Sequence, residues 1–203
     1  MGIILIRGSQ EAKIIETTEL MEIRWHGRGG QGAVTSAELL AQAAINEGKY
    51  AQGFPSFGPE RRGAPVVAFN RVRANKPIRN RSAIISPDVV VVLDPGLQRV
   101  VDVTSGLKKD GILVLNTDRS IKDVEADIDR EWRIATVDAL KIAREVLGVP
   151  IVNTAMVGAL LKATRVIELE SLSEPLRQRF GLLGERNIKA VKRAFEETIV
   201  SGR

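Results

Sequence analysis

The 203-residue sequence contains no cysteine and a single histidine, His26. The absence of thiolates excludes disulfides, cysteine-ligated zinc and iron–sulfur clusters on this chain. A histidine metal site or a Ser–His–Asp triad would have to rest on His26 alone. We therefore predict no metal site in this protein.

Long apolar runs and aromatic residues are also scarce. No stretch approaches the roughly 20 apolar residues of a membrane helix, and the opening MGIILIRGSQ has no small-residue cleavage site behind it. We expect neither a membrane span nor a signal peptide, and a cytoplasmic location. The net charge of +5 permits nucleic acid, a phosphorylated cofactor or an acidic subunit as partner. With 4% aromatics and scattered basic residues, we expect no nucleic acid.

Short apolar strands alternate with amphipathic helices along most of the chain. The predicted strands lie at 22–27, 66–72, 88–94, 111–117 and 132–138. The predicted helices lie at 31–47, 97–106, 139–148, 153–163 and 187–200. This alternation predicts an α/β fold with a Rossmann-like, mainly parallel sheet, flanking helices and a helical C-terminal extension.

The two ends of the chain differ from this pattern. Residues 1–20 read as an N-terminal extension, and 21–203 as a single domain. After Pro150 the sequence predicts helices only. The helix at 153–163 is apolar nearly all round, so we expect it to be buried within the monomer or against another subunit. The last helix places four apolar residues on one face: Ile188, Val191, Phe195 and Ile199.

The motif Gly27-Arg28-Gly29-Gly30-Gln31-Gly32 fits the pattern G-x-G-x-x-G, between a predicted strand and a predicted helix. Glycines permit a tight turn and a close backbone approach, so free N–H groups and the positive helix end can face a phosphate. We predict a phosphate site here. The alternative is a tight strand-to-helix turn that binds no ligand.

A dinucleotide site would also need an acidic residue about 20 residues further on, to hold the ribose. Glu47 precedes the region where a second strand should run, and residues 49–54 contain no acid. Instead, GPERRGAP places Arg61 and Arg62 in a proline-framed loop, where guanidinium groups could bind phosphate in a bidentate manner. Two solvated surface arginines remain an alternative. So does a free-standing NAD(P)-dependent dehydrogenase in which one of these arginines reads a 2′-phosphate.

Four motifs, in their order and spacing, resemble the gamma subunit of pyruvate/2-oxoacid:ferredoxin oxidoreductases. They are GRGGQGAV (27–34), FPSFGPERRGAP (54–65), DVVVVLD (88–94) and NTAMVGALL (153–161). The similarity runs from about Met21 to the C-terminal helix. The glycine and arginine motifs together point to the pyruvate or branched-chain 2-oxoacid branch.

This resemblance implies a subunit of an enzyme that converts a 2-oxoacid, coenzyme A and oxidised ferredoxin into acyl-CoA, CO2 and reduced ferredoxin. It places thiamine diphosphate and iron–sulfur clusters on alpha, beta and delta-type partner subunits. The glycine loop would receive coenzyme A phosphate through Gly27, Arg28, Gly29, Gly30, Gln31, Gly32 and Ala33. Arg61 and Arg62 would contact further phosphates, and Asn153 and Met156 would lie near the pantetheine arm. This chain would position the thiol and supply no catalytic residue.

Three more residues need an interpretation. His26 lies beside the glycine loop and could act as a base on the thiol, but we favour a packed structural histidine, since no acidic neighbour in sequence orients it. The Gln31 amide either points at the ligand or caps the helix. Asp94 lies where residues at a sheet end line a ligand crevice.

For the protein as a whole, a non-catalytic scaffold subunit is the remaining alternative.

Overall fold

The computed structural model describes residues 20–56, 63–128 and 132–202. Within them, seven strands form one sheet in the order β2-β3-β1-β4-β5-β6-β7. The strands are β1 (Met21–Arg28), β2 (Tyr50–Pro55), β3 (Pro65–Arg73), β4 (Val89–Val92), β5 (Ile112–Asn116), β6 (Arg133–Val137) and β7 (Ile199–Val200). The α-helices are α1 (Ala33–Asn46), α2 (Ile121–Asp127), α3 (Ala139–Ile142), α4 (Asn153–Thr164), α5 (Ser173–Phe180) and α6 (Gly184–Glu197).

The centre of the sheet is parallel and its edges are antiparallel. β1 pairs with β4, β4 with β5 and β5 with β6 in parallel, whereas β3 lies antiparallel to both β1 and β2, and β7 antiparallel to β6. The continuous apolar run of β4 is buried at every position, as expected for a strand covered on both faces. The predicted Rossmann-like α/β fold with a parallel sheet centre is confirmed.

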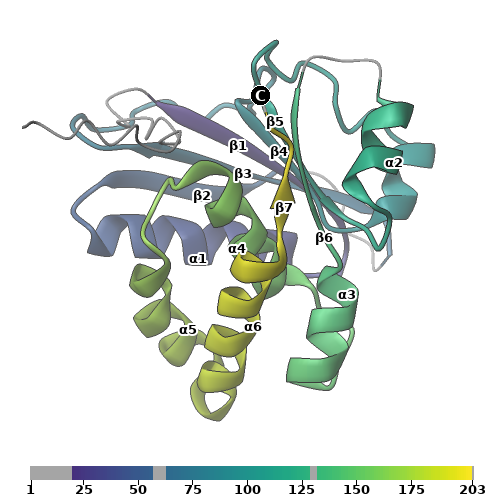
Figure 1. The fold of residues 1–203 in the computed structure, drawn as a ribbon. Coiled ribbons are helices and arrows are strands. Elements are labelled where there is room, and N and C mark those ends of the chain that lie inside the picture. The colour runs from purple at the N-terminus through teal and green to yellow at the C-terminus, as the bar shows by residue number, and fades with distance from the viewer. Residues whose placement is uncertain (1–19, 57–62, 129–131, 203) are drawn as a thin grey trace, which may run out of the picture.

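Helices α1 and α3 to α6 lie on one face of this sheet, and α2 lies apart from them (Figure 1). Trp25 of β1 and Leu40 of α1 belong to the core on the first face, together with Met156 and Leu160 of α4. A smaller core on the other face joins Val92 and Leu113 to α2 and to the segment that follows β4. Helix α4 is buried along nearly its whole length and packs against α6, so of the two alternatives the structure shows burial within the monomer.

Strand β2 occupies an edge of the sheet, because β3 is inserted between it and β1. The sequence YAQGFP carries a weak strand signal, and a glycine in a strand usually weakens it. Gly53 has a packing reason: a Cβ at this position would lie 2.5 Å from the carbonyl oxygen of Ala37 in α1. Only glycine therefore allows β2 to lie this close to α1.

Three predictions about local structure are wrong. Residues 97–106 do not form one helix: a 3-10 helix spans Pro95–Arg99 and turns follow it, with Gly106 in the left-handed region. The region after Pro150 is not only helical, since Ile199 lies in β7, more than half exposed, rather than on the apolar face of α6. The motif FPSFGPERRGAP (54–65), whose lack of periodicity predicts a loop throughout, begins in β2 and ends in β3.

The remaining boundaries agree closely with the predictions. α1 lies within the predicted 31–47, and Gly48 follows it with a positive φ. The predicted helix at 139–148 is α3 continued by a π-helical turn, Ala143–Leu147. None of the described helices has the length and apolar character needed to cross a membrane. The predicted N-terminal extension lies outside the described residues, except for Leu20.

Candidate functional site

The carboxyl ends of β1 and β4 define the candidate site. These two strands are parallel neighbours, but the chain leaves β1 toward β2 on one side and leaves β4 toward β5 on the other. In open α/β sheets, ligands bind in the crevice at such a switch point. The glycine loop follows β1, and Asp94 follows β4, so both lie at this switch point, which we call the crevice.

The glycine loop turns sharply from β1 into α1. Gly30 and Gly32 have φ values of +95° and +83°, which side chains other than glycine rarely adopt. At Gly27 an added Cβ would lie 3.2 Å from the Cβ of Ala33, so strand and helix are in close contact there. These glycines meet the backbone demands of a tight phosphate-binding turn.

The N-terminal end of α1 has no side-chain cap. Gly32 occupies the cap position, and the first turn contains no acidic residue. The backbone N–H of Ser36 donates to the Gly32 carbonyl oxygen at 2.9 Å, so the N–H groups of the preceding first-turn residues have no acceptor in their own helix. An open, positive helix end next to a glycine turn is suited to an anionic group.

Asp94 connects the two loops of the crevice. One carboxylate oxygen accepts hydrogen bonds from Arg28 Nε at 3.0 Å and Gln31 Nε2 at 2.8 Å, and the other accepts from the Gly96 N–H at 2.8 Å. Gln31 Oε1 in turn accepts from the Arg28 N–H at 2.8 Å. Gln31 therefore neither caps α1 nor points freely at a ligand, and Asp94 compensates the charge of Arg28.

Asn153 is brought to the glycine loop by α4, whose first residue it is. A Cβ at Gly32 would lie 2.7 Å from Asn153 Nδ2, so the two residues are in close contact. Asn153 is 4% exposed, and no hydrogen bond to its side-chain amide is found among the described residues. Asn153 is not among the residues with a fully buried, unpaired side-chain atom, so its amide keeps some accessible surface through which it can bind a polar ligand. Met156, one turn further along, is fully buried and is not accessible to a ligand in this structure.

Arg61 and Arg62 lie outside the described residues. The residues that follow them in sequence are joined to the glycine loop. The Gly63 N–H donates to the Gly29 carbonyl at 3.2 Å, the Gly29 N–H donates to the Ala64 carbonyl at 2.9 Å, and Arg28 Nη1 donates to the Gly63 carbonyl at 3.2 Å. The contacts of the two arginines with a ligand stay a prediction.

His26 is a structural histidine here. It is 7% exposed, and its Nε2 accepts a hydrogen bond from Arg24 Nε at 3.0 Å. Burial and the neighbouring Arg24 guanidinium lower the pKa of His26 to about 4, so the ring is neutral near pH 7. Because its unprotonated nitrogen is already occupied, the geometry favours the packed histidine over a base that removes a thiol proton.

Sequence reasoning missed one residue near the open helix end. Arg179 of α5 reaches the first turn of α1, where Nη2 lies 3.5 Å from Thr35 Oγ1 and 3.8 Å from the Glu38 carboxylate. No motif surrounds Arg179, and only the packing of α5 against α1 brings it there. Among the described residues, no cluster of acidic or histidine side chains could hold a metal ion.

The strand order also bears on the dinucleotide alternative. In a dinucleotide fold the strand after the first helix lies beside β1, so that an acid at its end reaches the ribose. Here β3 separates β2 from β1, and β2 contains no acidic residue. The described crevice therefore lacks the part that distinguishes a dinucleotide site from a general phosphate site.

Comparisons with known proteins agree with this geometry. Residues 22–197 match the family described as pyruvate ferredoxin/flavodoxin oxidoreductase. The pyruvate/ketoisovalerate oxidoreductases common subunit gamma of Thermococcus kodakarensis is 55% identical over 89% of this chain and 98% of its own length. Pyruvate synthase subunit PorC of Methanothermobacter marburgensis is 50% identical over 90% of this chain and all of its own length.

A solved structure gives the same result. The crystal structure of pyruvate oxidoreductase subunit PORC from Thermotoga maritima has a TM-score of 0.78 and 37% identity, covering 90% of this chain and 99% of that one. The chain therefore belongs to the pyruvate ferredoxin/flavodoxin oxidoreductase family. Its relatives place it among the gamma subunits of these multi-subunit enzymes, which confirms the resemblance stated above.

Proposed function

We propose that this gamma subunit binds coenzyme A at the crevice between β1 and β4 and holds its thiol for acyl transfer on a partner subunit. The observation that carries the proposal is the glycine turn that leads into the uncapped N-terminal end of α1 at the switch point. The overall reaction is the oxidative decarboxylation of a 2-oxoacid, with coenzyme A and oxidised ferredoxin giving acyl-CoA, CO2 and reduced ferredoxin.

Different residues of the crevice would contact different parts of coenzyme A. A phosphate would lie against the backbone of Gly29 to Ala33, with Arg28 and Gln31 fixed beside it by Asp94. Because Asp94 compensates the charge of Arg28, further positive charge is needed, and Arg61 and Arg62 would supply it. The Asn153 amide would bind a polar part of the pantetheine arm, and Met156 would support that helix from the core.

The remaining chemistry belongs to partner subunits in this proposal. A chain without cysteine holds no iron–sulfur cluster, so electrons would leave through other subunits toward ferredoxin. Thiamine diphosphate would likewise be bound by alpha, beta or delta-type partners. This subunit would contribute by proximity: it would fix the thiol near the acyl group and raise its effective concentration.

The 2-oxoacid would be pyruvate or a branched-chain relative. Relatives at about half identity carry names that include pyruvate alone or pyruvate together with ketoisovalerate. A gamma subunit common to two such enzymes indicates that the oxoacid is selected elsewhere in the assembly. We propose the same division for this protein, with the specificity residing in its partners.

Calorimetric titration of the assembled enzyme with coenzyme A, dephospho-CoA and NADH tests the proposal. Coenzyme A should bind with 1:1 stoichiometry per gamma subunit, and Arg61→Ala with Arg62→Ala should weaken it by about 10-fold or more, as expected for lost charge-assisted contacts. Gly32→Ala should also weaken binding, because the added Cβ displaces Asn153.

Gly48→Ala is the matched control for Gly32→Ala. Gly48 also has a positive φ of +80°, but an added Cβ there meets no atom within 4 Å and lies at the other end of α1. Unchanged coenzyme A binding by the Gly32→Ala and double-arginine variants would overturn the proposed site. Tighter binding of NADH than of coenzyme A would favour the alternative function, an NAD(P)-dependent dehydrogenase.

A further inference from the structure

The positive charge of the protein is concentrated in one segment, contrary to the expectation of scattered basic residues. Residues 63–87 contain five basic residues and no acidic one. They are Arg71, Arg73, Lys76, Arg79 and Arg81. The whole chain has 30 basic and 25 acidic residues, so its net charge of +5 equals the charge of this segment alone. A local imbalance of this size is an electrostatic signal for an acidic partner.

Four of these five cations are available to a partner. Arg71 is 2% exposed and forms an ion pair with Glu22 at 2.8 Å. Arg73 is partly buried, while Lys76, Arg79 and Arg81 are exposed, and none of the four pairs with an acid in the described part of the chain. Arginines elsewhere, such as Arg177 and Arg193, do pair with glutamates.

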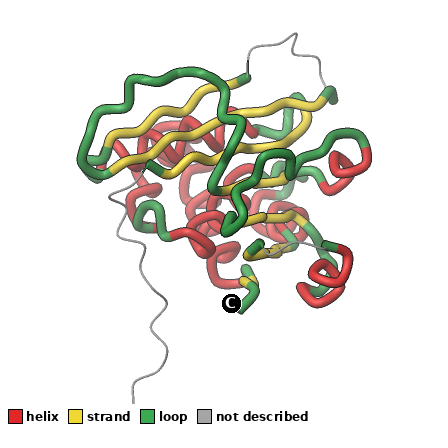
Figure 2. Tube along the Cα trace, turned by 90° about the horizontal axis from the view of Figure 1, so that it is seen from above, coloured by secondary structure: helices red, strands yellow, loops and turns green. Residues whose placement is uncertain are grey.

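The loop that carries these residues is fixed against the sheet rather than free. Gln52 Nε2 donates to the Ile78 carbonyl at 2.9 Å, and Arg71 Nη1 donates to the Asn80 carbonyl at 3.3 Å. Asn80 Oδ1 accepts from both the N–H and the hydroxyl of Ser82 at 2.9 Å. Figure 2 shows the long loop between β3 and β4 passing over the strands. A preorganised surface loses little entropy when it binds.

An apolar groove runs beside this basic loop. A cavity of about 560 Å³ lies between α1 and the edge strand β2. Its apolar lining is Ala41 and Ile45 of α1 with Ala51 and Phe54 of β2, and Arg81, Gln42 and Glu38 also line it. The Glu38 carboxylate lies 3.8 Å from Arg179 Nη2, which compensates its charge. Gln52 also lines it, and its Oε1 atom is buried without a hydrogen-bond partner. A buried acceptor of this kind is costly unless a donor reaches it.

The edge of β2 makes the groove suitable for an extended chain. In the described residues β2 pairs only with β3, so its outer edge presents unpaired backbone groups. An added strand can use such an edge for main-chain hydrogen bonds, while its alternate side chains enter a neighbouring groove.

We propose that the basic loop (Arg73 to Arg81) and the groove along β2 together dock an extended, acidic segment of a partner subunit of the oxidoreductase. The inference rests on the subunit role of this chain and not on the coenzyme A site. An electron carrier is a poorer occupant, because it must approach a cluster and this chain has no cysteine to hold one. The scarcity of aromatic residues disfavours single-stranded nucleic acid.

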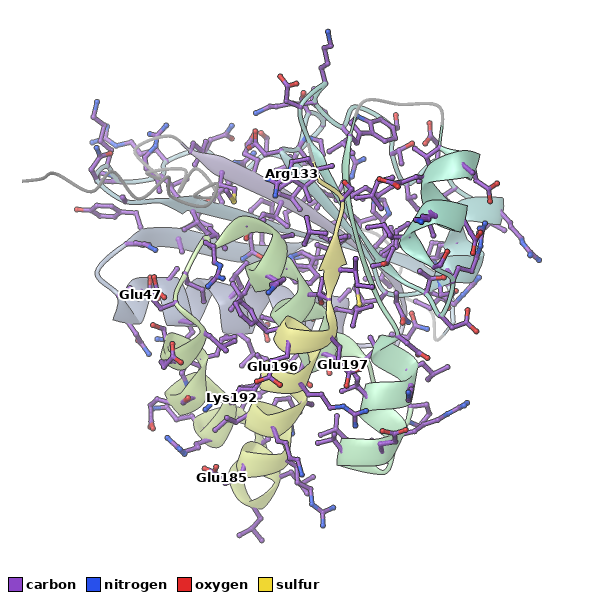
Figure 3. The ribbon with its side chains drawn as sticks, in the orientation of Figure 1. Glu47, Arg133, Glu185, Lys192, Glu196 and Glu197 are labelled. Atoms are coloured by element: carbon purple, nitrogen blue, oxygen red, sulfur yellow. The ribbon has the colours of Figure 1, made fainter. Side chains whose placement is uncertain are left out.

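Charge reversal tests the basic loop. Lys76→Glu, Arg79→Glu and Arg81→Glu should raise the Kd of this subunit for the remaining purified subunits by about 10-fold or more near 0.1 M NaCl, and the effect should shrink near 0.5 M NaCl. The matched control reverses three exposed cations of α6: Arg186, Lys189 and Lys192, the last labelled in Figure 3. The control should change the Kd by less than about 3-fold, since it changes net charge equally at another place.

A second variant tests the groove independently of the loop. Ile45 is 50% exposed and lines the groove, so Ile45→Glu places a carboxylate where the acidic segment should lie and should weaken assembly. Val149→Glu, at a residue 43% exposed, is its control. Thermal unfolding checks that all variants fold.

Three outcomes would overturn the docking proposal. They are an unchanged Kd for the loop and groove variants, equal losses in the variants and their controls, and saturable tight binding of an oligonucleotide of about 20 nucleotides that the loop variants abolish. Coenzyme A binding by those variants, measured once assembly is driven by excess partner, separates this proposal from the proposed function. Retained binding with weakened assembly is the expected result.

Discussion

The two ends of α1 both carry a glycine in the left-handed region, yet their surroundings differ. At Gly32, before the helix, φ is +83° and an added Cβ would lie 2.7 Å from Asn153 Nδ2. At Gly48, after the helix, φ is +80° and an added Cβ would meet nothing within 4 Å. Backbone conformation alone explains Gly48, whereas Gly32 also makes room for a buried amide. Similar φ values thus serve a helix stop at one end and a candidate site at the other.

The hydrogen bonds at the two ends of α1 also differ. At the C-terminal end of α1 lies Glu47, which is labelled in Figure 3. One of its carboxylate oxygens accepts a hydrogen bond from the Glu168 N–H at 2.7 Å, and the other pairs with Lys49 at 2.7 Å. At the N-terminal end, Asp94 fixes Arg28 and Gln31, but the first-turn N–H groups have no side-chain cap. At the C-terminal end, the carbonyl groups of Ala43, Ala44 and Ile45 accept hydrogen bonds from backbone N–H groups that follow the helix. The first-turn N–H groups at the N-terminal end have no such partner in their own helix.

The largest expected effect is the difference in stability loss between valine substitutions at Gly32 and at Gly48. Gly48→Val should lower the free energy of unfolding by about 2 kcal/mol through backbone strain, and Gly32→Val by about 4 kcal/mol, because the side chain also collides with Asn153. Denaturant unfolding measures both. Equal losses would show that Asn153 moves aside without cost and that the close contact is not a constraint.

A pH dependence should arise at the strand that leads into the N-terminal end. His26 has a pKa of about 4 when folded, against 6.5 in the unfolded chain, so the unfolded state binds more protons between these values. Its contribution is fully present above about pH 6.5 and falls by about 3 kcal/mol as the pH is lowered to about 4.

The variant His26→Gln isolates this effect from other titrating groups. Its amide oxygen can still accept from Arg24 Nε, but it binds no proton. The difference in unfolding free energy between wild type and variant should therefore change with pH across this window. A difference that stays constant from pH 7 to about pH 4 would contradict the lowered pKa of His26.

Removal of the Asp94 and Glu47 carboxylates should give a smaller difference in stability between the two ends of α1. Asp94→Ala leaves Arg28, Gln31 and the Gly96 N–H without their acceptor and should cost about 2 kcal/mol of stability. Glu47→Ala should cost about 1 kcal/mol, since its carboxylate has two partners, Lys49 and the Glu168 N–H, where Asp94 has three. Thermal unfolding gives both values, and coenzyme A binding to the assembled enzyme should fall only in Asp94→Ala. A loss of coenzyme A binding in Glu47→Ala would contradict the assignment of the site to the N-terminal end of α1 alone.

The smallest expected effect concerns the junction of α1 with α4. Ser36 Oγ lies 3.1 Å from the Gly32 carbonyl and 3.3 Å from the Asn153 carbonyl, so its hydroxyl joins the two helix starts. Ser36→Ala should cost about 1 kcal/mol or less, because the acceptors are carbonyls that keep other contacts. A loss above about 3 kcal/mol would show that this hydroxyl fixes the position of Asn153.

Much of the fold could be predicted from local signals. The buried valine run of β4, the glycine motif between β1 and α1, and the apolar α4 each have a pattern that a single window of sequence reveals. β2 could not be found in this way. Its sequence YAQGFP lacks alternation, and the reason for Gly53 is a contact with Ala37 in a different element.

Only the part of the candidate site that is local in sequence could be predicted. The glycine loop is contiguous in sequence, so its residues and their place between strand and helix could be predicted. The partners of Gln31 and Arg28 could not, because Asp94 lies 63 and 66 residues away and reaches them only through the pairing of β1 with β4. Arg179 likewise reaches α1 only through tertiary packing.

The burial of α4 has a consequence for the order in which the molecule is made. This helix is apolar on all sides, and α6, which packs against it, comes later in the chain, as does β7, which closes the sheet beside β6. α1, β5 and β6 precede α4 and cover part of it, but a growing polypeptide would leave the side that faces α6 uncovered until α6 has been made. Loss of α6 and β7 should therefore harm solubility far more than their length suggests.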